Sequence, residues 1–284
     1  MNKKIAVARL SIISNSVLII LKLAAGLISG SVSIISEAIH SFMDLLAAVI
    51  AFFSVRISDR PADSKHPYGH GKFENISGVV EAILIFVAAI WIIYEAIKKL
   101  LQPGEIESLQ IGFIVMMISA TVNFFVSRKL YKVAKETDSI ALEADALHLK
   151  TDIYTSLGVA VGLLLIWFTG FHLLDPIIAI LVAMLILKES FMLFRRAYGP
   201  LLDTALSENE VRIIKQIVDA KCSEKFTYHH FRTRRAGTYK YVDFHLNVPS
   251  EMTVKEAHDF CDAIEVDIKK SIDFIEVTIH VEYT

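Results

Sequence analysis

The stretch "SEAIHSFMDLL", residues 36–46, places His40 and Asp44 inside an otherwise apolar run that begins near Ser31 and continues to Val55. Residues separated by four positions lie on one face of a helix. At 1.5 Å per residue, the pair would lie about 12 to 18 Å along a helix that begins near Val32. A charged side chain near the centre of a bilayer costs at least about 2.5 kcal/mol. The sequence therefore predicts a functional pair inside a membrane helix.

The composition agrees with a membrane protein. The chain has 284 residues, of which 54% are hydrophobic, and its mean hydropathy is +0.50. That is too apolar for an ordinary soluble domain of this length, and a spanning helix needs about 20 apolar residues. Six segments meet this requirement, and they are Ile5–Leu27, Val32–Ile57, Ile76–Lys98, Ile111–Leu130, Ile140–Phe168 and Leu174–Phe194.

Basic residues gather at one set of segment ends, which predicts that both chain termini face the cytoplasm. The opposite loops offer mainly Lys98 and Lys99. The formal net charge is -2, and the charged residues are distributed according to the membrane topology. This distribution indicates no nucleic-acid partner. The basic ends contain Lys3, Lys4 and Arg9; Arg56, Arg60, Lys65 and Lys72; Arg128, Lys129, Lys132 and Lys135; and Arg195 and Arg196.

A second domain follows the apolar segments. Charges become frequent in "RRAYGPLLDTALSENE", residues 195–210, so we divide the chain into a transmembrane transport domain, 1–203, and a cytoplasmic domain, 204–284. Ser207 with Glu210, and Thr253 with Glu256, have the spacing of a capping box at a helix start.

The cytoplasmic domain also contains alternating sequences typical of strands. In "YKYVDFHLNV", residues 239–248, and "IEVTIHVEYT", residues 275–284, apolar and polar side chains alternate. The order helix, strand, strand, helix, strand predicts an α+β sandwich with its helices on one sheet face. About 80 residues form a marginal core alone, which favours dimerisation. Cys222 and Cys261 fall in this domain without C-x-x-C spacing, and we interpret both as small buried residues.

A second polar pair repeats the first. The stretch "DALHLKTDIY", residues 145–154, contains His148 and Asp152 at the same four-residue spacing. Two imidazoles and two carboxylates can supply four ligands to a tetrahedral divalent ion and neutralise both acidic charges. The alternative is a pair of His–Asp hydrogen bonds that lock the helices together.

Four other polar residues interrupt the apolar segments. Glu37 and Asp145 share helix faces with the two pairs but lie nearer the helix ends, so we expect solvated residues of a vestibule. Glu81 and Asn123 are single polar positions in their segments, and we expect them to form hydrogen bonds between helices.

With these pairs in place, the chain resembles the cation diffusion facilitator family over nearly its whole length. The resemblance rests on the two His-x-x-x-Asp pairs, the loop "DSKHPYGHGKFE", residues 63–74, and a cytoplasmic domain after six helices. Such proteins are homodimeric exporters that exchange a divalent metal for protons. The resemblance implies that His40, Asp44, His148 and Asp152 bind the transported ion, and that this ion is zinc.

The resemblance also implies metal ligands in the loop. Asp63, His66 and His70 match a surface zinc site of some bacterial members, and a solvated histidine loop is the alternative. Lys72 and Asp203 match positions that form a salt bridge between protomers.

A third group of expected ligands belongs to the cytoplasmic domain, which the resemblance implies is metallochaperone-like. Zinc there would be regulatory, and a permanent structural zinc is the alternative. The residues that match the family's cytoplasmic cluster are His229, His245, His258, His280 and Glu282.

We therefore expect a secondary transporter that exports zinc from the cytoplasm in exchange for protons. Iron, cobalt, cadmium and manganese are the alternative cargoes, and a membrane metal sensor or a metalloenzyme is the alternative class. An enzyme is disfavoured because four protein ligands leave no open coordination position, and no H-E-x-x-H motif occurs. The expected setting is lipid of a bacterial inner membrane.

Overall fold

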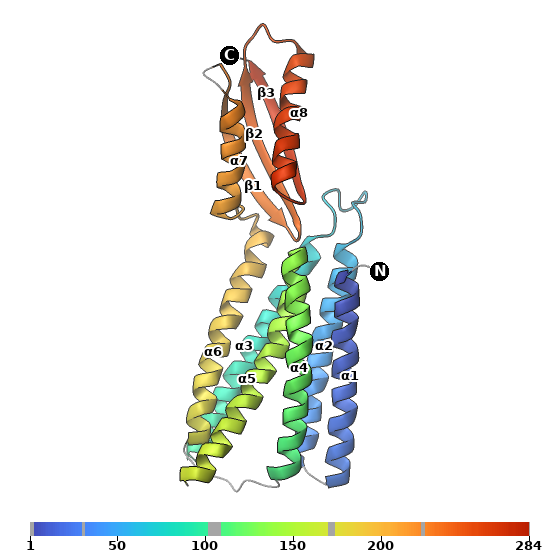
Figure 1. The fold of residues 1–284 in the computed structure, drawn as a ribbon, viewed down its shortest axis with the longest axis vertical. Helices are drawn as coiled ribbons and strands as arrows, with labels where there is room; N and C mark the ends of the chain where they lie inside the picture. Colours follow the sequence, from blue (N-terminus) through green and yellow to red (C-terminus); the bar gives the residue numbers. More distant parts are fainter. Residues whose placement is uncertain (1–2, 30–31, 102–108, 170–173, 223–224, 284) are drawn as a thin grey trace. The chain divides into compact units, whose positions relative to one another are not determined.

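The computed structural model describes residues 3–29, 32–101, 109–169, 174–222 and 225–283, and these form two compact units, Met1–Tyr198 and Gly199–Thr284. Within helices, the side chains of residues 26, 28–29, 32–40, 43, 99, 109–113, 116, 156, 159–169 and 174–175 lie outside this description. The first unit contains six long helices that run side by side (Figure 1). Their bounds are α1 Lys3–Ser29, α2 Val32–Ser58, α3 Lys72–Leu101, α4 Leu109–Thr137, α5 Ile140–Thr169 and α6 Leu174–Tyr198.

Helix α5 lies between two apolar clusters. One cluster joins its Leu142 and Leu149 to buried residues of α1, α2 and α4, including Leu130. The other joins Ala144 to α3 and α6, including Ile186. Helix α5 is therefore held on both sides, which fixes the direction of the polar side chains that it carries.

The outward faces of the first unit are apolar. Three helices are long and apolar enough to cross a membrane among the residues described, and they cover Lys3–Ala25, Lys72–Lys98 and Pro176–Leu202. Large apolar side chains stay exposed on these helices, as expected where the surrounding solvent is lipid. Examples are Ile20, Val87, Trp91, Leu181 and Met184.

The second unit is an α+β domain with a mixed three-stranded sheet. The sheet order is β1-β2-β3, with β1 and β2 antiparallel and β2 and β3 parallel. The parallel pair requires a crossover, which α8 supplies. After a short 3₁₀ helix, Gly199–Leu202, the elements are α7 Glu208–Lys221, β1 Thr227–Ala236, β2 Tyr239–Val248, α8 Val254–Ser271 and β3 Ile275–Tyr283.

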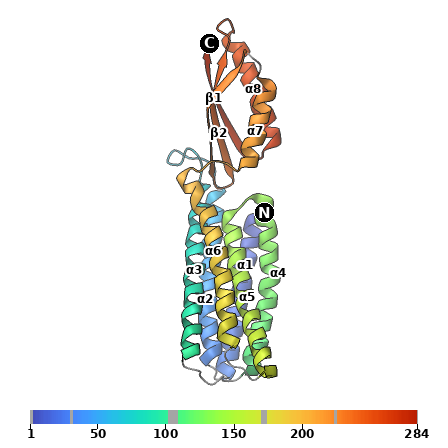
Figure 2. The same cartoon turned by 90° about the vertical axis from the view of Figure 1, so that its left-hand side faces the viewer.

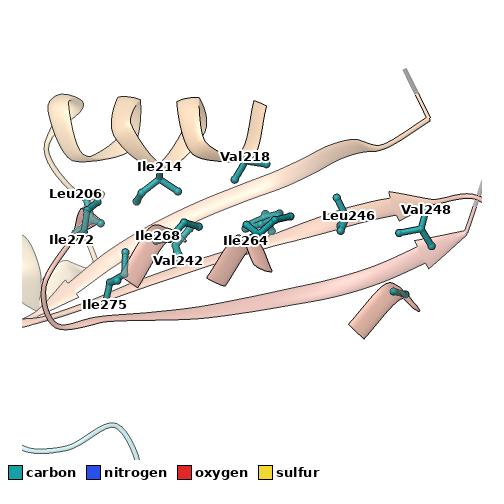
Figure 3. Close-up of a cluster of buried hydrophobic side chains, with 12 residues drawn as sticks. Leu206, Ile214, Val218, Val242, Leu246, Val248, Ile264, Ile268, Ile272 and Ile275 are labelled. Atoms are coloured by element: carbon teal, nitrogen blue, oxygen red, sulfur yellow. The ribbon is translucent and has the colours of Figure 1, made fainter. Parts of the chain in front are cut away.

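Both helices of this domain cover the same face of the sheet (Figure 2). The alternation predicted for β2 is confirmed, because Val242, Phe244, Leu246 and Val248 are buried. These side chains meet apolar residues of α7 and α8, including Ile264 (Figure 3). The polar residues of the strands consequently lie on the opposite face, and they include four of the five predicted cytoplasmic ligands, His229, His245, His280 and Glu282.

Both predicted capping boxes are confirmed. The hydroxyl of Ser207 accepts from the backbone N–H of Glu210, and the hydroxyl of Thr253 accepts from that of Glu256. Each glutamate in turn accepts from the backbone N–H of its N-cap residue. These reciprocal bonds set the first residue of each helix.

Candidate functional site

Helices α2 and α5 bring Asp44 and His148 into direct contact. His148 Nε2 lies 2.9 Å from Asp44 Oδ1, and the two residues are 8% and 5% exposed. The contact joins residues 104 positions apart in the sequence. Asp44 and His148, one residue from each predicted pair, thus meet in space, as both the metal and the hydrogen-bond interpretations require.

Asp152 completes a group of three candidate ligands with Asp44 and His148. The closest ligand atoms of the three residues all lie within 4.8 Å of one another. Zinc bonds of about 2.0–2.1 Å at a tetrahedral angle place two ligands about 3.3 Å apart. A small contraction around a cation would therefore bring the group to coordination distance. Asn123 of α4 donates to Asp152 Oδ2 at 3.5 Å, which is a hydrogen bond between helices, as predicted for Asn123.

His40 is the fourth predicted ligand, and its side chain falls outside the described part of the chain, as does that of Glu37. Its backbone continues α2 one turn before Asp44. The role of His40 thus stays a prediction from the spacing.

The prediction of a solvated Asp145 is wrong. Asp145 is completely buried, and its Oδ1 accepts from the hydroxyl of Ser11 on α1 at 3.1 Å. Sequence position near a helix end suggested water access, but α1 packs over this part of α5. The structure thus places the buried carboxylate of Asp145, with its hydroxyl donor, about one helical turn before His148.

Glu81 was expected to form a hydrogen bond to another helix, but its side chain accepts one from within α3. Its Oε1 accepts from Ser77 at 3.2 Å, and the side chain is completely buried. Helix α3 packs against α5 here, because Ala82, next to Glu81, belongs to the same apolar cluster as Ala144. Reasoning from the sequence missed this burial between helices, although a lone glutamate in the apolar run around it was the available signal.

The loop between α2 and α3 brings Asp63, His66 and His70 together. Asp63 Oδ1 lies 3.2 Å from His66 Nδ1, and Asp63 Oδ2 lies 3.4 Å from His70 Nε2. Hydrogen bonds from the backbone N–H groups of His66 and Lys65 hold the pKa of Asp63 below its usual value. Gly69 has φ of +80°, a conformation that favours glycine. The loop is therefore a defined turn, and its three candidate ligands lie in mutual reach.

The sheet of the second unit aligns three histidines of the predicted cytoplasmic cluster. His229 pairs with His245 across β1 and β2, and His245 pairs with His280 across β2 and β3. Glu282 Oε1 lies 2.9 Å from His245 Nδ1, and its Oε2 lies 3.2 Å from His229 Nε2. The hydrogen bond from His245 lowers the pKa of Glu282. His280 Nε2 is more distant, at 3.8 Å from Glu282 Oε1.

His258 does not join this cluster within one chain. It lies on α8, where its Nε2 is 3.6 Å from Asp262 Oδ2, and it is largely exposed. His230, which is not among the predicted ligands, instead lies beside the cluster, with its ring centroid 5.0 Å from that of His245. A β-bulge between His229 and Arg232 and a positive φ of 49° at His230 produce this placement.

Asp203 and Lys72 were predicted to bond between protomers. Asp203 Oδ1 lies 3.5 Å from Arg234 Nη1 of the same domain. The pairing with Lys72 stays a prediction. Cys222 and Cys261 are free thiols, and burial raises the pKa of both.

Comparison with sequence families gives two matches that together cover most of the chain. Residues 8–202 match a family described as the cation efflux transmembrane domain. Residues 206–284 match one described as the cytoplasmic domain of cation efflux proteins.

Curated relatives match over nearly the full length. An uncharacterized transporter of Synechocystis, sll1263, is 37% identical over 92% of this chain and 84% of its own. The cation-efflux pump FieF of Shewanella oneidensis is 31% identical over 96% of this chain and 92% of its own. FieF of Klebsiella pneumoniae is 29% identical over 93% and 88%.

Proposed function

This chain belongs to the cation efflux family, the cation diffusion facilitators, and from this premise we propose that it exports zinc from the cytoplasm in exchange for protons. Members of this family are membrane transporters of divalent metal and not enzymes. The observation that carries the proposal is the group of the buried Asp44 and His148 with the partly buried Asp152, whose ligand atoms lie within 4.8 Å of one another. Its two carboxylates match the charge of a divalent cation, and its imidazole favours a zinc-like ion over magnesium or manganese.

The same residues give a physical reason for exchange with protons. A metal ion binds neutral imidazole and ionised carboxylate, so protons compete for the lone pairs that hold the metal. The 2.9 Å contact between His148 and Asp44 is the arrangement that a protonated imidazole and a carboxylate adopt. Protons from outside would establish this contact, and metal from inside would displace it. His40 would supply the fourth ligand.

The proposed topology places all six helices of the first unit across the membrane, with both termini in the cytoplasm. The predicted excess of basic residues at one set of ends supports this orientation. Alternating exposure of the site to the two sides would then carry the ion across. The expected location is a bacterial inner membrane, in agreement with the bacterial relatives.

The cytoplasmic cluster would have a regulatory role in a homodimer. His229, His245 and Glu282 form a preassembled group, and the exposed His258 and His280 offer two further ligands. Zinc bound there would stabilise one geometry of two paired domains and so bias the membrane helices. The loop group of Asp63, His66 and His70 would be a second surface site for zinc.

Zinc flux into proteoliposomes, measured with and without a pH gradient, tests this function. We expect the parent protein to show flux that depends on the gradient, and Asp152→Ala to lose it. Glu136→Ala, which changes an exposed carboxylate paired with Lys3, is the matched control and should keep the parent rate. Absence of gradient-dependent flux in the parent would exclude proton-coupled zinc export, and retained flux in Asp152→Ala would exclude the site.

A further inference from the structure

The two ring nitrogens of His148 have different surroundings. Nε2 faces Asp44 at 2.9 Å, within the proposed cation site. Nδ1 is buried and has no hydrogen-bond partner among the residues that the structure describes. A histidine that binds metal through one nitrogen almost always donates its other N–H to a carboxylate, a carbonyl or water. The structure therefore leaves one acceptor for His148 to be identified.

Glu81 carries a matching orphan atom. Its Oε2 is buried and without a partner in the described part of the chain, whereas its Oε1 accepts from Ser77. Helices α3 and α5 pack together here, because Ala82, next to Glu81, belongs to the same apolar cluster as Ala144. Three residues before Glu81, a Cβ atom at Gly78 would lie 2.6 Å from Cγ2 of Ile140 of α5, so the two helices are in direct contact along this stretch. A buried donor position and a buried acceptor, each unpaired among the described residues, thus occur on two helices that pack against each other.

We propose that Glu81 is a positioning residue that accepts a hydrogen bond from Nδ1–H of His148 when the site holds a cation. This bond would fix the tautomer that presents the Nε2 lone pair to the cation, and it would set the orientation of the ring. The inference rests on the proposed ligand set, because it requires that His148 binds the cargo through Nε2. Glu81 acts through His148 and does not itself touch the cation.

Asp145 is the competing acceptor. It is as buried as Glu81, and its Oδ2 is also without a partner among the described residues. The hydroxyl of Ser11 already holds its other oxygen and ties the carboxylate toward α1. Among the described residues, Glu81 forms no hydrogen bond to a third helix. Its side chain can therefore rotate toward Nδ1 of His148 without breaking a hydrogen bond between helices. Asp145→Asn is therefore the matched control for Glu81 variants.

The test measures the zinc dissociation constant of the full-length protein in lipid nanodiscs by competition with a chelator. The background contains Glu282→Ala and Asp63→Ala, so that the loop and cytoplasmic groups do not contribute. In this background, Glu81→Leu should weaken zinc binding about 10- to 100-fold. Glu81→Gln, which keeps a carbonyl acceptor of the same shape, should restore most of the affinity, and Asp145→Asn should have a smaller effect than Glu81→Leu.

A double-variant cycle separates positioning from a merely structural role. When His148→Ala is already present, adding Glu81→Leu should change the dissociation constant less than about threefold, because the group through which Glu81 acts is gone. An equal loss in both backgrounds, no loss in either, or a larger coupled loss for Asp145→Asn would overturn the proposal. Asp152→Ala serves as the separate check: if it leaves zinc binding unchanged, the ligand set itself fails, and with it the proposed function.

Discussion

His148 and Asp44 show how one contact can serve two states of a transporter. At 2.9 Å, the imidazole and carboxylate satisfy each other when no metal lies between them. Both are nearly inaccessible to water, where leaving either alone would be costly. A cation would bind through these same two atoms. The contact between His148 and Asp44 therefore stabilises the metal-free site, and a bound metal ion would replace it.

Asp44→Asn tests this dual use at the residue scale. The amide keeps the size of the side chain and can still bond His148, but it removes one negative charge from the cation site. We expect the initial rate of zinc flux to fall at least about 100-fold. A change of this size corresponds to a loss of about 2.7 kcal/mol in the free energy that stabilises the bound cation. The thermal midpoint should change by only a few degrees. Parent-like flux in the asparagine variant would contradict the role of the charge.

Most of this residue-scale picture could be predicted from spacing, and part of it could not. The His-x-x-x-Asp pairs predicted the meeting of Asp44, His148 and Asp152, because periodicity fixes the face of a helix. Burial of Asp145 could not be predicted, since it depends on how α1 crosses α5 and not on α5 itself. The position of His230 could not be predicted either, because it depends on a β-bulge in β1 that shifts the alternation of side chains between the two sheet faces.

At the scale of elements, a buried carboxylate ties together four helices of the first unit. Glu74 of α3 accepts from Lys4 of α1 at 3.0 Å, from Ser58 of α2 at 2.8 Å and from Ser139, which immediately precedes α5. Its side chain is 1% exposed. Such a network fixes the relative positions of helix ends more strictly than apolar packing, because hydrogen bonds are directional.

Glu74→Ala should destabilise the first unit strongly. It removes the nearest carboxylate of the largely buried Lys4 ammonium, whose other carboxylate neighbour is Asp59 at 3.7 Å. Breaking a buried ion pair completely costs about 3–5 kcal/mol, and the contact with Asp59 should place the loss near the lower end of that range. Thermal unfolding in detergent should show a lower midpoint than for the parent. Glu136→Ala, at an exposed pair, should leave the midpoint within experimental error, and an equally small change for Glu74→Ala would refute the network.

Gly78 lies where α3 packs tightly against residues of α5 and α6. A Cβ atom at this position would lie 2.6 Å from Cγ2 of Ile140 and 3.0 Å from Cβ of Ala197. Gly78→Ala should therefore push α3 away from α5 and α6 and lower the thermal midpoint, despite the better helix propensity of alanine. Gly158→Ala, whose Cβ would meet only Val182 at 3.0 Å and Ile178 at 3.8 Å, should have a smaller effect. A higher midpoint for Gly78→Ala would show that the helices can separate freely.

The start of α7 should respond to pH through Glu210. Partial burial raises the pKa of Glu210, but hydrogen bonds from Ser207 and Lys240 outweigh this and leave it lowered. A carboxyl with a lowered folded pKa adds stability above its unfolded value of about 4.3, and this stability is lost as the pH falls through the folded pKa. Glu210→Gln should therefore reduce hydrogen-exchange protection of α7 at pH 7 by about 0.3–1 kcal/mol. As the pH falls below the folded pKa of Glu210, the variant and the parent should converge, and a difference that grows toward low pH would contradict this sign.

Helix existence was easier to predict than helix ends. All six predicted apolar segments lie within helices, but α4 continues to Thr137, beyond the predicted Leu130. Hydropathy stops at the edge of the apolar region, whereas the backbone hydrogen bonds of a helix continue wherever polar residues can face water. The capping boxes of the second unit gave exact starts because they are local chemistry.

At the scale of the whole molecule, three groups of candidate ligands lie in three different settings. Among the described residues, one group lies largely buried in the helical unit, one lies on a loop, and one lies on the polar face of a sheet. Only the first combines burial with paired charge in the middle of long helices, which is the arrangement that transport requires. The other two are accessible from water and suit sensing or storage of metal.

Glu282→Ala should separate regulation from transport. Glu282 contacts both His229 and His245, so its loss should disperse the cytoplasmic group. We expect zinc flux at saturating zinc to stay within about twofold of the parent, whereas the zinc concentration for half-maximal rate should rise, because a regulatory ligand shifts an equilibrium between states. The readout is the concentration dependence of flux. Complete loss of flux at saturating zinc would instead assign this cluster to the transport step.

The most direct test of the ligand assignment is the position of zinc in crystals of the full-length protein, located by anomalous scattering on both sides of the zinc absorption edge. We predict a peak about 2.0–2.2 Å from ligand atoms of Asp44, His148 and Asp152, with the contact between His148 and Asp44 opened by the ion. The peak should vanish in Asp152→Ala while the loop and cytoplasmic peaks remain. Zinc bound at saturating concentration only in the loop and cytoplasmic groups, with Asp44 and His148 still in contact, would contradict the assignment.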